Sequence, residues 1–169
     1  MTPEAKARQM IDAKLEQSGW VIQDNTHIYR HAALGVAVRE YPTNTGPVDY
    51  ALFVDGNLAG VVEAKRDEMG ENISAVESQS GRYARSSYKY APAESRVRFI
   101  YEATGELTYF TDRDDIKPSS RRVFSFHRPE TLRMLLTKKG TVRNNLKCIP
   151  ALNTEGFRDS PVNLSPEDS

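Results

Sequence analysis

Two short runs of hydrophobic and β-branched residues lie at the centre of the chain. They span 48–54 and 58–65, and Asp55, Gly56 and Asn57 separate them. Asp-Gly sequences favour tight turns between antiparallel strands because these residues tolerate a positive φ at little cost. The pattern therefore predicts a β-hairpin at the centre of the fold.

The register of this hairpin decides which polar side chains meet. If three residues form the loop, Asp49 lies directly opposite Glu63, and a two-residue loop shifts the pairing by about one position. Opposed residues share one face of the sheet, and Lys65, two residues after Glu63, points to that face. Mg²⁺ prefers one or two carboxylates together with water and phosphate oxygens. The hairpin therefore predicts a metal-dependent phosphodiesterase, with Lys65 stabilising the nucleophile or the transition-state charge.

The same residues have a simpler interpretation, a solvated strand face on which Glu63 and Lys65 form an ordinary ion pair. Against it, Glu63 directly follows the apolar residues 60–62, so its carboxylate emerges from a strand that we expect to be buried. Burying an unpaired charge is costly unless a metal or a counter-charge offsets it. A non-catalytic DNA-binding or subunit-docking module is therefore the competing hypothesis.

The N-terminal segment has the pattern of a helix. Thr2 and Pro3 match an N-cap and a first helical position, and Ser18-Gly19 matches a helix end. Three apolar residues between them lie on one helical face: Ala7, Ile11 and Leu15. Glu4 is most simply a first-turn acid that the helix dipole favours, with a metal or DNA-side role as the minority alternative.

A second helix is expected over 69–90. Gln79 and Tyr83 lie one turn apart on one face, where they can position a phosphate beside the carboxylates. Three basic residues of the same segment are candidate phosphate contacts: Arg82, Arg85 and Lys89. The alternative is an amphipathic helix with Tyr83 packed in the core and the basic residues solvated.

The rest of the chain predicts a second hairpin and a third helix. The strands of this hairpin are expected over 96–102 and 107–111, and the helix begins at Pro129. The periodicity fades after residue 137, and residues 151–169 collect Asn, Asp, Ser and Pro. We therefore expect one nuclease-like domain over 1–148 and a linker or disordered tail over 149–169.

Composition limits the chemistry that the chain can perform. It has 169 residues with 38% hydrophobic content, enough for one core. The single cysteine, Cys148, excludes an internal disulfide, and the three histidines have no metal-ligand spacing. The sequence has neither a membrane-spanning stretch nor a signal peptide pattern, which makes a cytoplasmic location the simplest expectation.

The net charge is zero, but the charges are unevenly distributed. Residues 1–75 hold seven basic and eleven acidic side chains, whereas residues 116–148 hold nine basic side chains and one acidic side chain. A basic segment beside an acidic one suits duplex DNA. A solvated surface or a docking face for another subunit explains the distribution equally well.

Several of these motifs together resemble the N-terminal endonuclease domain of the R (restriction) subunit of type I restriction-modification enzymes. The resemblance extends over residues 3–136. The motifs that carry it are Glu4-x3-Arg8-x2-Ile11-Asp12-x2-Leu15-x3-Gly19-Trp20, Val48-Asp49-Tyr50-Ala51-Leu52, Glu63-Ala64-Lys65, Gln79-x3-Tyr83 and Phe126-His127-Arg128-Pro129-Glu130-x-Leu132.

The resemblance implies a PD-(D/E)xK nuclease of α/β class, a restriction-endonuclease-like core in which helices flank a central mixed β-sheet. It implies Asp49 and Glu63 as metal ligands and Lys65 as the catalytic lysine. The backbone carbonyl of Ala64 and the Glu4 carboxylate are further candidate ligands.

The resemblance also assigns the remaining motifs. Gln79 and Tyr83 match the Gln-x3-Tyr motif of RecB-like nucleases and would position the DNA. One departure is that Val48 precedes Asp49, with Pro47 one place earlier. The proline of the superfamily's name is its least demanding element, so the departure casts little doubt on activity.

The resemblance further implies Mg²⁺-dependent cleavage of double-stranded DNA, in a complex with modification and specificity subunits. In that family a helicase-like translocase follows the nuclease domain, whereas this sequence has no Gly-x4-Gly-Lys-Ser/Thr phosphate loop. The chain is therefore expected to be an N-terminal fragment, with ATP used only through a motor that it lacks. A stand-alone repair nuclease with the same core is a third hypothesis.

Overall fold

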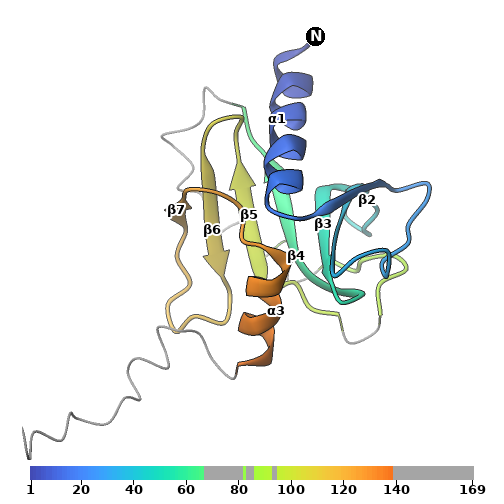
Figure 1. Cartoon of the computed structure of the whole chain (residues 1–169), viewed down its shortest axis with the longest axis vertical. Coiled ribbons are helices and arrows are strands. Elements are labelled where there is room, and N and C mark those ends of the chain that lie inside the picture. The colour runs from blue at the N-terminus through green and yellow to red at the C-terminus, as the bar shows by residue number, and fades with distance from the viewer. Residues whose placement is uncertain (67–81, 83–85, 93–94, 139–169) are drawn as a thin grey trace, which may run out of the picture.

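A seven-stranded mixed sheet forms the centre of the fold, and its strands are arranged in chain order (Figure 1). The computed structural model describes residues 1–66, 82, 86–92 and 95–138. The strands are β1 (Val21–Asp24), β2 (Gly35–Tyr41), β3 (Val48–Val54), β4 (Asn57–Ala64), β5 (Phe99–Ala103), β6 (Thr108–Asp112) and β7 (Arg121–Val123). The β1/β2 and β4/β5 pairs are parallel, and the other neighbours are antiparallel. The predicted α/β class with a central mixed sheet is confirmed.

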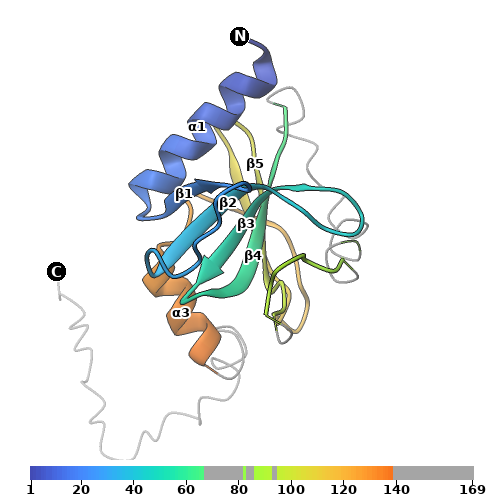
Figure 2. The same ribbon diagram turned by 90° about the vertical axis from the view of Figure 1, so that its right-hand side faces the viewer.

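Two helices, α1 (Pro3–Gln17) and α3 (Pro129–Thr137), lie on the same side of the sheet (Figure 2). Ile11 of α1 and Leu132 of α3 are fully buried in one core cluster with Trp20. A second cluster, which includes Val61 of β4, is packed by residues from loops such as Tyr88. The central strands are therefore buried on both faces, which explains their nearly continuous runs of apolar residues.

The N-terminal helix has the ends that the sequence predicts. The Thr2 hydroxyl accepts a hydrogen bond from the Ala5 N–H at 3.2 Å, and Pro3 occupies the first turn. The helix ends at Ser18, and Gly19 follows it with a φ of 91°. Glu4 lies in the first turn, where a carboxylate is favoured by the helix dipole.

The turn of the central hairpin contains two residues, not three. Val54 pairs with Asn57, and not with Leu58, so Asp55 and Gly56 alone form the turn. Both have a positive φ, 51° at Asp55 and 76° at Gly56. This backbone geometry matches the right-handed twist of the flanking strands, which is why Asp-Gly favours two-residue turns.

A β-bulge at Ala59 of β4 then restores the register that the three-residue loop predicted. The extra residue shifts the pairing by one position, and further along the hairpin Tyr50 pairs with Val62. The same register places Asp49 opposite Glu63, one residue beyond the last recorded pair. The sequence left the loop length open between two and three residues. The turn has two residues, and the bulge gives the two carboxylates the register of the three-residue alternative.

The second hairpin is also confirmed, since β5 and β6 pair antiparallel. The helix predicted over 69–90 lies largely outside the described residues, but its last five residues are not helical. Ser87 instead pairs with Asn44: its N–H donates to the Asn44 side chain at 2.8 Å, and its carbonyl accepts from the Asn44 N–H at 3.1 Å. This pairing replaces helical hydrogen bonds, so the prediction was wrong for 86–90, and Lys89 lies in a turn.

His127 ties the segment before α3 to the sheet. Its Nδ1 lies 2.6 Å from the Tyr101 hydroxyl, and its backbone carbonyl accepts a hydrogen bond from Trp20 Nε1 at 2.9 Å. Burial lowers the pKa of His127, Arg121 lowers it further, and Asp112 opposes the shift. Burial also raises the pKa of Tyr101, so the phenol remains protonated.

The lowered pKa of the buried His127 predicts that this residue makes folding stability depend on pH. A lowered folded-state pKa means that the unfolded chain binds more protons, so stability falls as the pH drops below the usual value near 6.5. The loss is at most about 1.4 kcal/mol per pH unit for one proton. Urea unfolding between pH 7.5 and 5 measures it. The control is His127→Asn, which should lack this component of the slope, and equal slopes for the two proteins would contradict the assignment.

Candidate active site

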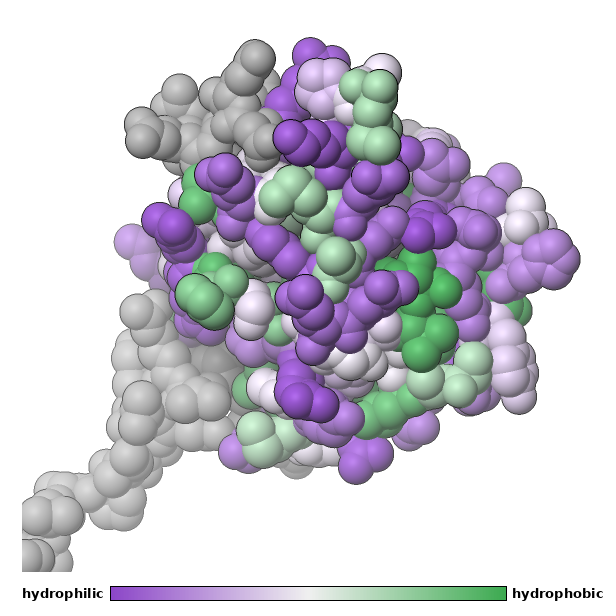
Figure 3. Space-filling model, turned by 45° about the horizontal axis from the view of Figure 1, so that its top comes forward, coloured by the Kyte–Doolittle hydropathy of each residue, from purple (hydrophilic) through white to green (hydrophobic). Residues whose placement is uncertain are grey.

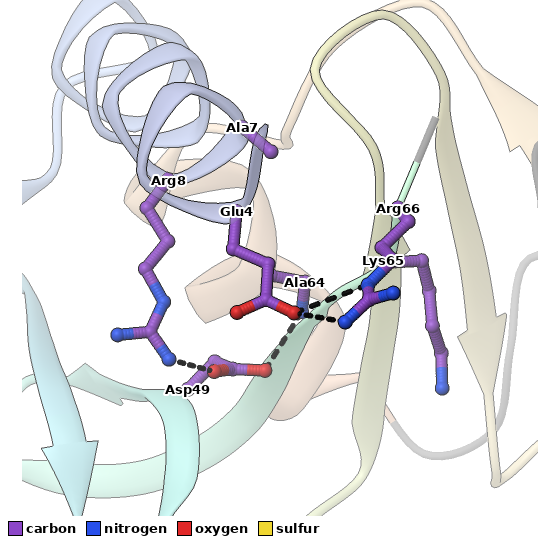
Figure 4. A pocket seen from close by; sticks show the side chains of 7 residues that line it. All are labelled: Glu4, Ala7, Arg8, Asp49, Ala64, Lys65 and Arg66. Carbon is purple, nitrogen blue, oxygen red and sulfur yellow. Dashed lines mark hydrogen bonds and ion pairs between the residues drawn. The ribbon is translucent and has the colours of Figure 1, made fainter. Parts of the chain in front are cut away.

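Asp49 lies near the start of β3, and both of its carboxylate oxygens accept hydrogen bonds (Figure 4). Oδ1 accepts from Arg8 Nη2 of α1 at 3.0 Å, and Oδ2 accepts from the Ala64 N–H of β4 at 2.9 Å. The side chain is 22% exposed. The carboxylate is therefore held between a helix and the neighbouring strand, and it remains accessible from one side.

Glu63 and Lys65 form an ion pair at the end of β4, with Lys65 Nζ 2.8 Å from Glu63 Oε1. Their side chains are 20% and 18% exposed. The simpler interpretation of the sequence predicts an ion pair between these two side chains. It also predicts that the pair lies on a solvated strand face, whereas both side chains are partly buried. Lys65 is also fixed through its backbone, whose N–H donates to the Ala103 carbonyl of β5 at 2.7 Å.

The edges of β4 determine where the Ala64 carbonyl points. The N–H and C=O of one residue lie on the same edge of an extended strand. The Ala64 N–H is directed at Asp49 of β3, whereas the next N–H along the chain, that of Lys65, is directed at β5. The Ala64 carbonyl therefore faces the β3 edge, on which Asp49 lies.

A cavity of about 360 Å³ opens beside Asp49. Two carboxylates and three cations line it: Asp49, Glu4, Arg8, Lys65 and Arg66. Arg66 binds the Glu4 carboxylate through Nη2 at 2.6 Å and through Nε at 3.1 Å. This ion pair forms one side of the cavity (Figure 4). The excess of cations makes this cavity suitable for an anionic group.

Helix α1 is fixed against the sheet by Asp12, one turn beyond Arg8. Asp12 Oδ2 pairs with Arg39 of β2 at 2.7 Å, and Asp12 Oδ1 accepts from the Tyr50 hydroxyl of β3 at 2.8 Å. Burial and the bond to Asp12 raise the pKa of Tyr50, which therefore remains a donor. These contacts hold Arg8 above the start of β3.

Four carboxylates lie in one row across the sheet, and we call them the carboxylate row: Glu40, Asp49, Glu63 and Glu102 of β2, β3, β4 and β5. The pairs on either side of Glu40 place it opposite Asp49. The Tyr50↔Val62 pair places Asp49 opposite Glu63, and Glu63 is the register partner of Glu102. Register partners lie opposite each other on neighbouring strands.

Sequence analysis missed Glu40 and Glu102, although each has a signal in the sequence. Glu40 lies in β2, a strand that was not predicted, shortly after its apolar residues 36–38. Glu102 is the one acid within the apolar strand 99–103, a position where a carboxylate is costly. Glu102 is 5% exposed, and burial raises its pKa, whereas Lys65 lowers it and Glu63 raises it further.

Other predicted site residues are not tested by the described structure. Gln79, Tyr83 and Arg85 lie outside the described residues, and Arg82 donates to the Thr45 carbonyl at 3.5 Å. Within residues 1–66, 82, 86–92 and 95–138, no group of three or more His, Cys, Asp or Glu side chains is placed to hold a metal ion. Asp49 and Glu63 instead pair with separate cations.

The surface at the end of the molecule where α1 begins is mainly hydrophilic, with hydrophobic residues in small groups (Figure 3). This surface suits a polar or charged partner better than an extended apolar one. No helix within the described part of the chain is long and apolar enough to cross a membrane.

A mixed sheet with a carboxylate on β3 facing a Glu-x-Lys on β4 defines a restriction-endonuclease-like fold, as the sequence predicted. Residues 29–113 match the family model described as the second domain of the type I restriction enzyme EcoKI endonuclease subunit. The chain belongs to this family. The matched residues include β2 to β6 and therefore the whole carboxylate row.

A curated relative carries the same name. The type I restriction enzyme EcoKI endonuclease subunit of Escherichia coli strain K12 is 33% identical over 93 residues, which are 48% of this chain. The match covers 8% of that subunit's length. No solved structure shows significant similarity to the chain.

Proposed function

We propose that this chain is a metal-dependent nuclease domain that cuts double-stranded DNA as part of a type I restriction enzyme. The observation that carries the proposal is the register of β3 and β4, which places Asp49 opposite Glu63 with Lys65 beside it. Family membership supports a role in restriction over a stand-alone repair nuclease.

The residues fit a hard divalent cation. Asp49 and Glu63 supply carboxylates, and the Ala64 carbonyl faces the same strand edge, so the donors are the oxygen ligands that Mg²⁺ prefers. Each carboxylate is partly buried and already paired with a protein cation, with which a bound metal ion would have to compete. Glu4 lies in the same cavity, but Arg66 holds its carboxylate, so we rank Glu4 below the other ligands.

A bound Mg²⁺ would supply a Lewis acid and lower the pKa of water in the site. The chain's own cations have different tasks. Lys65 would stabilise the attacking hydroxide or the charge that develops on the phosphate, because its ammonium lies beside Glu63. Arg66 lines the cavity with a 67% exposed side chain and is placed to contact a phosphate of the DNA backbone.

The partners follow from the family and from the charges. We propose that the modification and specificity subunits provide sequence recognition, and that ATP acts only through a motor outside this chain. Phosphate contacts would come partly from exposed basic residues of the 116–148 segment, such as Arg121 and Arg122 of β7.

A second candidate function is a non-catalytic docking or DNA-binding module. The 2.8 Å Glu63–Lys65 ion pair favours it, because the pair neutralises both side chains without a metal. The register of β3 and β4 favours the nuclease. A structural Glu63–Lys65 ion pair needs neither Asp49 opposite Glu63 nor a cavity beside Asp49.

The proposal is tested by the metal dependence of cleavage. In the complete restriction complex that contains this chain, supercoiled plasmid should be converted to nicked and linear forms with Mg²⁺ and ATP. ATP hydrolysis by a motor also needs Mg²⁺, so removing Mg²⁺ does not isolate the nuclease site. A substitution in the nuclease site itself is the more specific test. ATP hydrolysis should persist in Asp49→Asn while the plasmid remains supercoiled, and cutting by this variant at the wild-type rate would overturn the proposal.

A further inference from the structure

The carboxylate row alternates with two cations from different elements. Arg8 of α1 bridges the first two carboxylates: its Nη1 lies 2.8 Å from Glu40 Oε1, and its Nη2 lies 3.0 Å from Asp49 Oδ1. Lys65 lies beside the other two, because it binds Glu63 at 2.8 Å and Glu63 is the register partner of Glu102. Asp49 therefore shares Arg8 with Glu40, and Glu102 is the carboxyl group next to the Glu63–Lys65 pair.

The charges of this row do not balance. Four carboxylates and two cations leave two negative charges when all four are ionised, which equals the charge that one divalent cation would neutralise. The two inner carboxylates, Asp49 and Glu63, are the ligands in the proposed function. Both are occupied by protein cations, so a metal ion would have to compete with Arg8 and Lys65 for them.

We propose that the two outer carboxylates, Glu40 and Glu102, are positioning residues that retain Arg8 and Lys65 at the site when the inner pair binds a divalent cation. The proposal rests on the proposed function and extends it. Glu40 keeps Arg8 through a bond that already exists, and Glu102 keeps the Lys65 ammonium next to the ligands.

The bonding of Arg8 supports this role. The guanidinium uses separate nitrogen atoms for the two carboxylates, so its bond to Asp49 can break while its bond to Glu40 remains. The bond to Glu40 is also the largest cause of the raised pKa of Arg8. Glu40 adopts a positive φ of 46°, which an L side chain rarely does, at the residue that meets Arg8.

The position of Glu102 supports the corresponding role for Lys65. Glu102 is 5% exposed, so a full negative charge there is unfavourable without a nearby cation. The Lys65 ammonium lowers the pKa of Glu102 against the effect of burial. When Glu63 binds a metal ion, Glu102 is the neighbouring carboxyl group that can hold the Lys65 side chain at the site.

A double-mutant cycle separates this role from a general effect of negative charge. Mn²⁺ affinity of the chain is measured by calorimetry for wild type, Glu40→Gln, Arg8→Ala and the double variant. Glu40→Gln should weaken binding about tenfold, because Arg8 then has only Asp49 as a partner. In the Arg8→Ala background the same change should weaken binding less than about twofold. Arg8→Ala alone should tighten binding.

The same cycle applies to Glu102→Gln with Lys65→Ala. Glu40 is 57% exposed, so its cycle remains informative if the buried Glu102 variant is unstable. The matched control is Glu16→Gln, which removes an exposed charge of α1 and should leave the affinity unchanged. If Glu40→Gln weakens binding equally with and without Arg8, the inference is wrong while the proposed function stands. If the wild-type chain binds no Mn²⁺, the proposed function itself fails.

Discussion

Replacing either Asp49 or Glu63 by alanine is expected to reduce DNA cleavage at least about 1000-fold. The two residues lie opposite each other near the start of β3 and the end of β4, and each would provide a ligand to one metal ion. Metal catalysis contributes several kcal/mol, and about 1.4 kcal/mol corresponds to a factor of ten in rate. The measurement is the rate of plasmid cleavage by the complete restriction complex.

Folding and assembly must be unaffected for this result to have meaning. Asp49→Asn keeps an oxygen that can accept the Ala64 N–H, and Glu63→Gln keeps its size, so both should fold and should lose cleavage like the alanine variants. ATP hydrolysis by the complex should be unchanged. Glu16→Ala removes an exposed acid from α1 and should cut normally. Cleavage at the wild-type rate by either alanine variant would exclude the residue as a ligand.

Lys65→Ala is expected to lose nearly all cleavage while retaining divalent-metal binding. The ammonium is not a ligand: it lies 2.8 Å from Glu63, where it can stabilise the nucleophile and the transition-state charge. Removal of an ammonium from the edge of a metal site also removes repulsion, so Mn²⁺ should bind as tightly as in the wild type or more tightly. Plasmid cleavage and Mn²⁺ calorimetry on the same variant measure the two effects.

The comparison with Asp49→Ala makes this result specific, since that variant should lose both cleavage and metal affinity. Lys65→Arg keeps the positive charge but changes its shape, and it should recover only part of the activity. Normal cutting by Lys65→Ala would indicate that the Glu63–Lys65 pair is structural, as the docking-module hypothesis requires.

The hairpin shows how far a local pattern predicts the site. Asp55-Gly56 identifies the turn because both residues tolerate a positive φ, but the pattern alone does not give the loop length. The bulge at Ala59 is visible only in the pairing of β3 with β4, and no turn motif in the sequence marks it. A three-residue loop predicts Asp49 opposite Glu63. The structure reaches the same pairing with a two-residue turn, because the bulge shifts the register of β4 by one residue.

The residues that sequence analysis missed are those whose role depends on distant partners. Glu40 meets Arg8, which is 32 residues away, and Glu102 meets Glu63 across a parallel pair of strands. Neither contact has a sequence spacing that predicts it. Residues 86–90 were predicted as helix and are not helical for the same reason, because Ser87 finds its hydrogen-bond partner in Asn44.

The central claim is that Asp49 and Glu63 together bind one divalent cation. Calorimetric titration of the chain with Mn²⁺ tests it most directly, with wild type compared with the Asp49→Asn/Glu63→Gln double variant and with the Glu16→Gln control. The account predicts saturable binding by the wild type and the control, and none by the double variant, with similar unfolding temperatures for all three. Equal affinity in all three proteins would contradict it.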